Sequence, residues 1–144
     1  AQVGKGAYGT VYKVEDRQCQ GRRVAVKVVS KSTVYSDTMW RKLLLEVEMV
    51  RDSSHPGIAA LLEVFQTPSS LVLVMEAGDG GSLRHCMDVV RKRRWPVEAF
   101  VAHVLQQTSA ALEYLFHERH IVHRDIKQDN IVLSKDFSRV MLID

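Results

Sequence analysis

The sequence has few of the residues that mark disulfide-stabilised, fibrous or membrane proteins. Only two of its 144 residues are cysteine and three are proline. A disulfide framework is therefore not expected, and a reducing intracellular compartment, the cytoplasm, fits better. No apolar run approaches membrane-spanning length, and no signal peptide is visible. The net charge of +3 is too small to indicate a nucleic-acid or membrane partner. What remains is an ordinary globular composition, 46% hydrophobic and 26% charged.

The first half of the chain predicts strands around one helix. Ser36 and Asp37 can cap a helix over residues 38–52, which the Ser-Ser-His-Pro-Gly stretch then ends. We expect the order β-β-β-α-β-β with mostly antiparallel pairing. The segments rich in β-branched and aromatic residues are 10–15, 23–30, 58–66 and 71–77.

The second half predicts helices followed by short strands. After a glycine-rich joint at 78–82, we expect a short helix over 83–94, a long helix over 96–117, and strand-like pieces at 131–134 and 140–144. The long helix carries apolar residues at three- and four-residue steps, so we predict that this stripe is core. The stripe contains Val97, Phe100, Val101, Val104, Leu105, Leu112, Leu115 and Phe116.

A glycine-rich stretch near the start has the pattern G-x-G-x-x-G-x-V. It comprises Gly4, Gly6, Gly9 and Val11. Glycines let backbone N–H groups approach phosphate without interference from Cβ. A dinucleotide-binding loop needs a strand before these glycines and a helix after them, but here a strand follows. This order favours a glycine-rich hairpin that covers a bound nucleotide, as in protein kinases.

Polar groups crowd the stretch His-Arg-Asp-Ile-Lys-Gln-Asp-Asn, residues 123–130. Together with the glycine pattern, the Val-Ala-Val-Lys motif at residues 24–27, and Asp144, this stretch resembles the protein kinase family. The motifs occur in the family's order with near-standard spacing over essentially the whole chain. Lys127 is typical of the serine/threonine type, and the general pattern is loosely similar to the calcium/calmodulin-dependent kinases.

The resemblance implies catalytic roles for four residues. Asp125 would orient the substrate hydroxyl and accept its proton, and Lys127 would neutralise the transferring phosphoryl group. Lys27 would contact the α- and β-phosphates of ATP while paired with a glutamate of the helix at 38–52. Glu46 fits that pairing by its register to the His-Pro-Gly-Ile break, and Glu48 is its rival.

The resemblance also implies the cofactors ATP and Mg²⁺. Asn130 and Asp144 match the metal ligands. The positions that match contacts with the nucleotide are Gly4, Gly6, Gly9, Val11, Ala25, Lys27, Met75, Glu76, Gly78 and Val132.

The implied fold is α+β and protein-kinase-like. Residues 1–77 would form a five-stranded antiparallel small lobe with one helix and the hinge. Residues 78–144 would form the first, mostly helical part of a large lobe, including the catalytic loop. In the family Asp144 begins Asp-Phe-Gly, so the chain matches a kinase domain truncated at that aspartate. We expect this fragment to be inactive alone and its long helix to expose apolar area.

The implied function of the parent protein is ATP-dependent phosphoryl transfer to Ser/Thr hydroxyls of protein substrates. Its expected partners are ATP and a protein substrate, with no nucleic acid or membrane, and the sequence names no regulatory partner. The alternative is a pseudokinase or a truncated nucleotide-binding scaffold, although a pseudokinase would usually have lost Lys27, Asp125 or Asp144. A small-molecule kinase is disfavoured by Lys127.

Other polar features have simpler interpretations. The basic run at 91–94 is more often a solvated helix end than a docking patch. His117, His120 and His123 would not share one helix face, so metal binding there is disfavoured. Ser82 stands where many kinases that prefer basic peptides have an acid, while Asp129 retains an acid in the catalytic loop.

Overall fold

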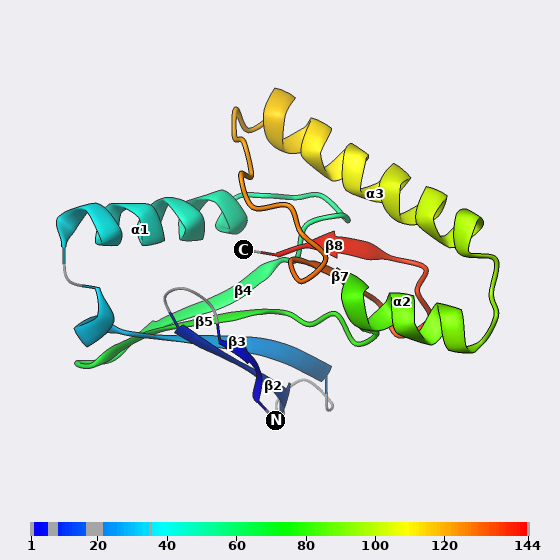
Figure 1. The fold of residues 1–144 in the computed structure, drawn as a ribbon. Coiled ribbons are helices and arrows are strands. Elements are labelled where there is room, and N and C mark those ends of the chain that lie inside the picture. The colour runs from blue at the N-terminus through cyan, green and yellow to red at the C-terminus, as the bar shows by residue number, and fades with distance from the viewer. Residues whose placement is uncertain (1, 6–8, 17–21, 35, 144) are drawn as a thin grey trace. The chain divides into compact units, whose positions relative to one another are not determined.

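The computed structural model describes residues 2–5, 9–16, 22–34 and 36–143, including the backbone but not the side chains of residues 2–5, 22, 46 and 49. The chain packs into two compact units (Figure 1). The first unit contains residues 1–52 and 60–77, and the second contains residues 53–59 and 78–144. Residues 53–59 thus belong by their packing to the second unit.

A five-stranded antiparallel sheet with the order β1-β2-β3-β5-β4 forms the first unit. Its strands are β1 (Gln2–Lys5), β2 (Gly9–Asp16), β3 (Arg22–Ser30), β4 (Leu61–Gln66) and β5 (Ser70–Glu76). The predicted strand at 58–66 begins three residues late, because Ile58 bridges Leu142 and Ala59 donates its N–H to the Leu142 carbonyl instead. The predicted five-stranded antiparallel arrangement is otherwise confirmed.

One α-helix, α1 (Asp37–Arg51), packs against this sheet after a short 3₁₀ helix, η1 (Lys31–Thr33). The Ser36 hydroxyl caps α1 by accepting a hydrogen bond from the Met39 N–H, as the sequence predicts. Leu43 is fully buried between α1 and the sheet, and Met39, Trp40 and Val47 pack around it. These residues recur at helical spacing, so one stripe of α1 closes the first core.

The second unit combines two helices with a three-stranded antiparallel sheet of order β6-β7-β8. Its elements are β6 (Gly81–Ser82), α2 (Leu83–Lys92), α3 (Val97–His117), β7 (Ile131–Leu133) and β8 (Val140–Leu142). The helix α2 ends two residues before the predicted boundary because Arg94 adopts a left-handed φ of 54°, which a helix cannot continue. Pro96 is the N-cap residue of α3, so the helix begins at Val97, one residue after the predicted start.

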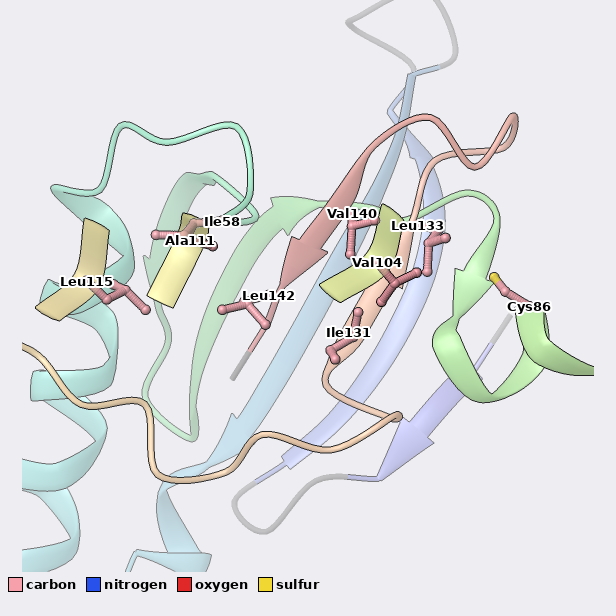
Figure 2. Close-up of a cluster of buried hydrophobic side chains, with 9 residues drawn as sticks. All are labelled: Ile58, Cys86, Val104, Ala111, Leu115, Ile131, Leu133, Val140 and Leu142. Atoms are coloured by element: carbon pink, nitrogen blue, oxygen red, sulfur yellow. The ribbon is translucent and has the colours of Figure 1, made fainter. Parts of the chain in front are cut away.

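The core of the second unit lies between α3 and the strands (Figure 2). From α3 it contains Val104, Ala111 and Leu115, and the other members are Ile58, Cys86, Ile131, Leu133, Val140 and Leu142. This packing holds β7 and β8 in place, and β7 directly follows the polar stretch 123–130.

The predicted core stripe of α3 was wrong for two of its members. Leu105 and Phe116 are 60% and 57% exposed, whereas Val104 and Leu115 are 4% and 5% exposed. Adjacent residues lie about 100° apart around a helix, so one step beyond a buried position already leaves the packed face.

Two leucines of α3 offer a matched stability test. Leu115→Ala removes a buried side chain from the second core, so we expect it to lower the free energy of unfolding by about 2–4 kcal/mol. Leu105→Ala makes the same chemical change at an exposed position and should change it by less than about 0.5 kcal/mol. Thermal and urea unfolding of both variants measures the difference. Equal losses from the two substitutions would contradict the packing described for α3.

No helix in the described part of the chain is both long enough and apolar enough to cross a lipid bilayer.

Candidate active site

The polar stretch 123–130 is a loop that joins α3 to β7 through turns. Arg124 has a φ of 65°, a conformation that L-residues rarely adopt, and it directly precedes Asp125. The Asp125 N–H donates to Nδ1 of His123 at 3.4 Å, and the Asn130 N–H donates to the Lys127 carbonyl at 3.0 Å. Local hydrogen bonds therefore fold the loop back on itself around Asp125.

Three of the predicted site residues meet in this loop. Lys127 Nζ lies 2.6 Å from Asp125 Oδ2. Asn130 Nδ2 donates to the same carboxylate oxygen at 2.8 Å and to the Asp125 carbonyl at 2.9 Å. Asn130 is only 6% exposed, so its amide is a buried support beneath a solvent-facing carboxylate. The arrangement fixes the direction in which Asp125 faces solvent.

The electrostatics keep Asp125 ionised. The hydrogen bond from Lys127 is the largest cause that lowers the pKa of the Asp125 carboxyl, and the bond from Asn130 adds to it. An ionised carboxylate held in one orientation can accept a hydrogen bond from a substrate hydroxyl. The Lys127 ammonium beside it supplies a positive charge that can meet an anionic group at the same place.

The described residues fit Mg²⁺ in part. Both described side-chain bonds of Asn130 use Nδ2, which leaves the carbonyl oxygen Oδ1 as a hard ligand of the kind that Mg²⁺ prefers. The backbone carbonyl of Asn130 accepts a hydrogen bond from the Ile143 N–H at 3.0 Å. This bond connects the loop to the residue before Asp144. Asp144 itself lies outside the described residues. Within the described ranges, no group of three or more His, Cys, Asp and Glu is placed to hold a metal.

The first unit places four other predicted residues on one face of its sheet. Val11 of β2 lies directly opposite Lys27 of β3, and Ala25 lies directly opposite Met75 of β5. Paired residues share a face, as do residues two apart along a strand, so these side chains line one surface. Lys27 is 3% exposed and Met75 is 8% exposed. The result is a surface that combines apolar side chains with the buried Lys27, and Lys13, which lies directly opposite Ala25, is on the same face.

Glu46 lies within α1, but its side chain is outside the described part of the structure, so the predicted pairing with Lys27 stays a prediction. Its rival Glu48 is exposed on the same helix.

The strands β1 and β2, which carry Gly4 and Gly9 of the glycine-rich stretch, pair antiparallel, in agreement with the strand order that the sequence predicts. Gly4 of β1 pairs with Val11 of β2, and Gly9 of β2 pairs with Val29 of β3. A Cβ on Gly9 would lie 2.3 Å from the Val28 carbonyl oxygen, so only glycine fits there without a backbone shift. Gly6 lies outside the described residues.

The segment predicted as a hinge connects the two units. Glu76 ends β5, and its N–H donates to the Ala60 carbonyl at 2.8 Å. Gly78 packs so closely on β7 that a Cβ there would lie 2.4 Å from Cβ of Val132. Gly78 and Val132, both predicted to contact the nucleotide, are therefore direct neighbours in the second unit.

The structure adds one polar contact that the sequence analysis missed. Arg84, in the first turn of α2, forms two hydrogen bonds with the carboxylate of Asp129 in the 123–130 loop. The two residues are 45 positions apart, and neither the spacing nor the local sequence gives a signal for this pair.

The family profile of the protein kinase domain matches residues 1–144. This chain belongs to the protein kinase family. The predicted resemblance and the predicted α+β, kinase-like fold class are thereby confirmed.

The chain is similar to several curated serine/threonine and calcium-dependent kinases. It is 38% identical over 132 residues to "Myosin light chain kinase A" of Dictyostelium discoideum, covering 92% of this chain and 43% of that protein. It is 36% identical over 130 residues to "Calcium-dependent protein kinase 3" of Plasmodium yoelii yoelii, covering 90% and 23%. It is 36% identical over 146 residues to "Serine/threonine-protein kinase srk1" of Schizosaccharomyces pombe, covering 94% and 24%. The chain spans less than half the length of these curated relatives.

Proposed function

We propose that the protein containing this chain transfers the γ-phosphoryl group of ATP to Ser/Thr hydroxyls of protein substrates. The observation that carries the proposal is the Asp125 carboxylate, oriented by Lys127 at 2.6 Å and by the buried Asn130 at 2.8 Å. Phosphoryl transfer depends mainly on positioning and charge, which such a cluster supplies. The match to the protein kinase domain and the names of the relatives support the same reaction class.

Each loop residue has a distinct role in this proposal. Asp125 accepts a hydrogen bond from the substrate hydroxyl and aims the attacking oxygen. Lys127 places its ammonium beside that oxygen, where negative charge gathers on the phosphoryl group. Asn130 and Asp144 would hold Mg²⁺, which, when bound, would neutralise charge on the phosphate oxygens.

The nucleotide lies, in this proposal, against the surfaces that carry the predicted contact residues. Lys27 supplies the buried cation for the phosphates, with Glu46 as its partner. Val11, Ala25 and Met75 offer an apolar surface to the adenine. Val132 and Gly78 are direct neighbours, and we keep them as the further nucleotide contacts that the family resemblance implies. The glycine-rich hairpin covers the phosphates with backbone N–H groups.

Residues 1–77 are then the small lobe and hinge, and residues 78–144 are the start of the large lobe with the catalytic loop. The packing of the chain into two compact units supports the boundary after residue 77, although residues 53–59 pack with the second unit. An intracellular, cytoplasmic location is part of the proposal, because ATP and its protein substrates are available there. We further propose that residues 1–144 alone are inactive, and the exposed Leu105 and Phe116 of α3 support this.

An acceptor series tests the proposed function. The full-length protein and the 144-residue segment are each incubated with Mg²⁺, ATP and three peptides that differ only in carrying Ser, Thr or Tyr at one position. We expect the full-length protein to phosphorylate the Ser and Thr peptides and not the Tyr peptide, and the segment to phosphorylate none. ATP binding by the full-length protein without any phosphopeptide would favour the pseudokinase alternative.

A further inference from the structure

Arg84 and Asp129 form a bidentate salt bridge at the edge of the catalytic loop. Arg84 Nε donates to Asp129 Oδ1 at 2.9 Å, and Nη2 donates to Oδ2 at 3.0 Å. Both carboxylate oxygens are therefore occupied by one guanidinium, the geometry in which an Arg–carboxylate pair is strongest. The Arg84 N–H also donates to the Gln128 carbonyl at 3.4 Å, so backbone and side chain meet the same part of the loop.

This pair lies beside the proposed catalytic cluster. Asp129 follows Asp125 by four residues and directly precedes Asn130, and all three belong to one hydrogen-bonded loop. The side chains of Arg84 and Asp129 are 64% and 49% exposed. A substrate chain that brings its hydroxyl to Asp125 therefore brings its neighbouring side chains near an accessible Asp129.

The charge at this position depends on the pairing. A lone exposed carboxylate there would attract substrates with Arg or Lys near the acceptor and disfavour acidic ones. The hydrogen bond from Arg84 is the largest cause that lowers the pKa of Asp129, and Lys127 acts in the same direction. At neutral pH the Asp129 carboxylate is therefore ionised, and its charge is paired with that of Arg84. Arg84 also interacts electrostatically with Asp88 on its own helix.

We propose that Arg84 is a specificity-determining residue that occupies Asp129 and so prevents the catalytic loop from selecting substrates with a basic side chain beside the acceptor hydroxyl. This inference rests on the proposed function and adds to it the charge class of the substrate. Arg84 takes the place that a substrate arginine would take. Removing its charge exposes an acidic site four residues from Asp125.

A peptide series with an unchanging Ser acceptor tests the proposal in the full-length protein. The reference peptide has Ala at the three positions on each side of the serine, and the others carry a single Arg or a single Glu at one of those positions. The variants are Arg84→Gln, Asp129→Asn and the double substitution, with Arg91→Gln as a matched control because Arg91 is another exposed arginine of α2. The measured quantity is the ratio of kcat/KM for each Arg peptide to that for the Ala peptide.

We expect this ratio to rise about fivefold in Arg84→Gln for at least one position, which corresponds to the upper range of exposed ion pairs. The rise should be absent in the double variant and in Arg91→Gln. An unchanged ratio in Arg84→Gln would overturn the proposal. An equal loss of activity on all peptides would also overturn it, because it would show that Arg84 only holds the loop in place and does not select substrates.

A binding measurement separates this proposal from the proposed function. Fluorescence anisotropy of the same peptides with Asp125→Asn and Asp125→Asn/Arg84→Gln proteins gives the affinity ratio without catalysis. If the wild type phosphorylates no peptide, the proposed function fails while the affinity ratio still decides the role of Arg84. An Arg-to-Ala affinity ratio that rises about fivefold on loss of Arg84 supports the role. An equal ratio, or no measurable peptide binding, overturns it.

Discussion

Asp125→Asn in the full-length protein should lower kcat for peptide phosphorylation by about 1000-fold, with a much smaller change in KM for ATP. The carboxylate accepts hydrogen bonds from Lys127 at 2.6 Å and from Asn130 at 2.8 Å. An amide has one acceptor oxygen in place of two and carries no charge. The variant therefore loses both the group that aims the substrate hydroxyl and the charge partner of Lys127. Steady-state kinetics with saturating peptide measures the effect.

The matched control for this substitution is Asp37→Asn, an equivalent change at an exposed aspartate of α1. Asp37→Asn should retain kcat within about twofold, because surface substitutions outside special contacts have small effects. Circular dichroism should show both variants folded, since the Asp125 side chain is 56% exposed. If Asp125→Asn keeps more than a tenth of the wild-type kcat, the role assigned to this carboxylate is wrong.

Lys27→Met should lower kcat/KM for ATP by about 100-fold, the loss expected when one preorganised charge next to the phosphates is removed. Lys27 is 3% exposed and lies on the sheet face shared with Val11, Ala25 and Met75. Methionine fills a similar volume without the charge, so the substitution tests the ammonium group and not the packing. Competition with a fluorescent ATP analogue and steady-state kinetics separate binding from transfer.

Lys42→Met makes the same chemical change at an exposed position of α1 and should leave kcat/KM within about twofold. Lys27→Arg should not restore activity, because the larger planar guanidinium does not replace a compact ammonium at a buried site. Wild-type kinetics in Lys27→Met, with normal folding, would exclude Lys27 from the nucleotide site.

Much of the fold was predictable because short-range patterns determine it. Strand alternation, the Ser36 cap and the helical repeat of α3 each act within a few residues, and the structure confirms the elements they predict. The family pattern in turn marked the residues that meet in the 123–130 loop. Local hydrogen bonds within that loop bring Asp125, Lys127 and Asn130 together.

Other features depend on contacts that sequence spacing does not reveal. The Arg84–Asp129 pair joins residues 45 positions apart, and the early end of α2 depends on the left-handed backbone of Arg94. The exposure of Leu105 and Phe116 depends on which face of α3 meets the strands, and an apolar stripe that is broad in sequence does not fix that face.

The most direct test of the proposed phosphoryl transfer is a single-turnover reaction. Excess full-length protein is mixed with γ-labelled ATP and the Ser peptide, with Mg²⁺ or with a chelator, and the label on the peptide is followed over time. The account predicts labelled phosphoserine in the Mg²⁺ reaction, no label with the chelator, and about 1000-fold slower labelling with Asp125→Asn. ATP bound in full while the peptide stays unlabelled, or equal labelling by Asp125→Asn, would contradict the account.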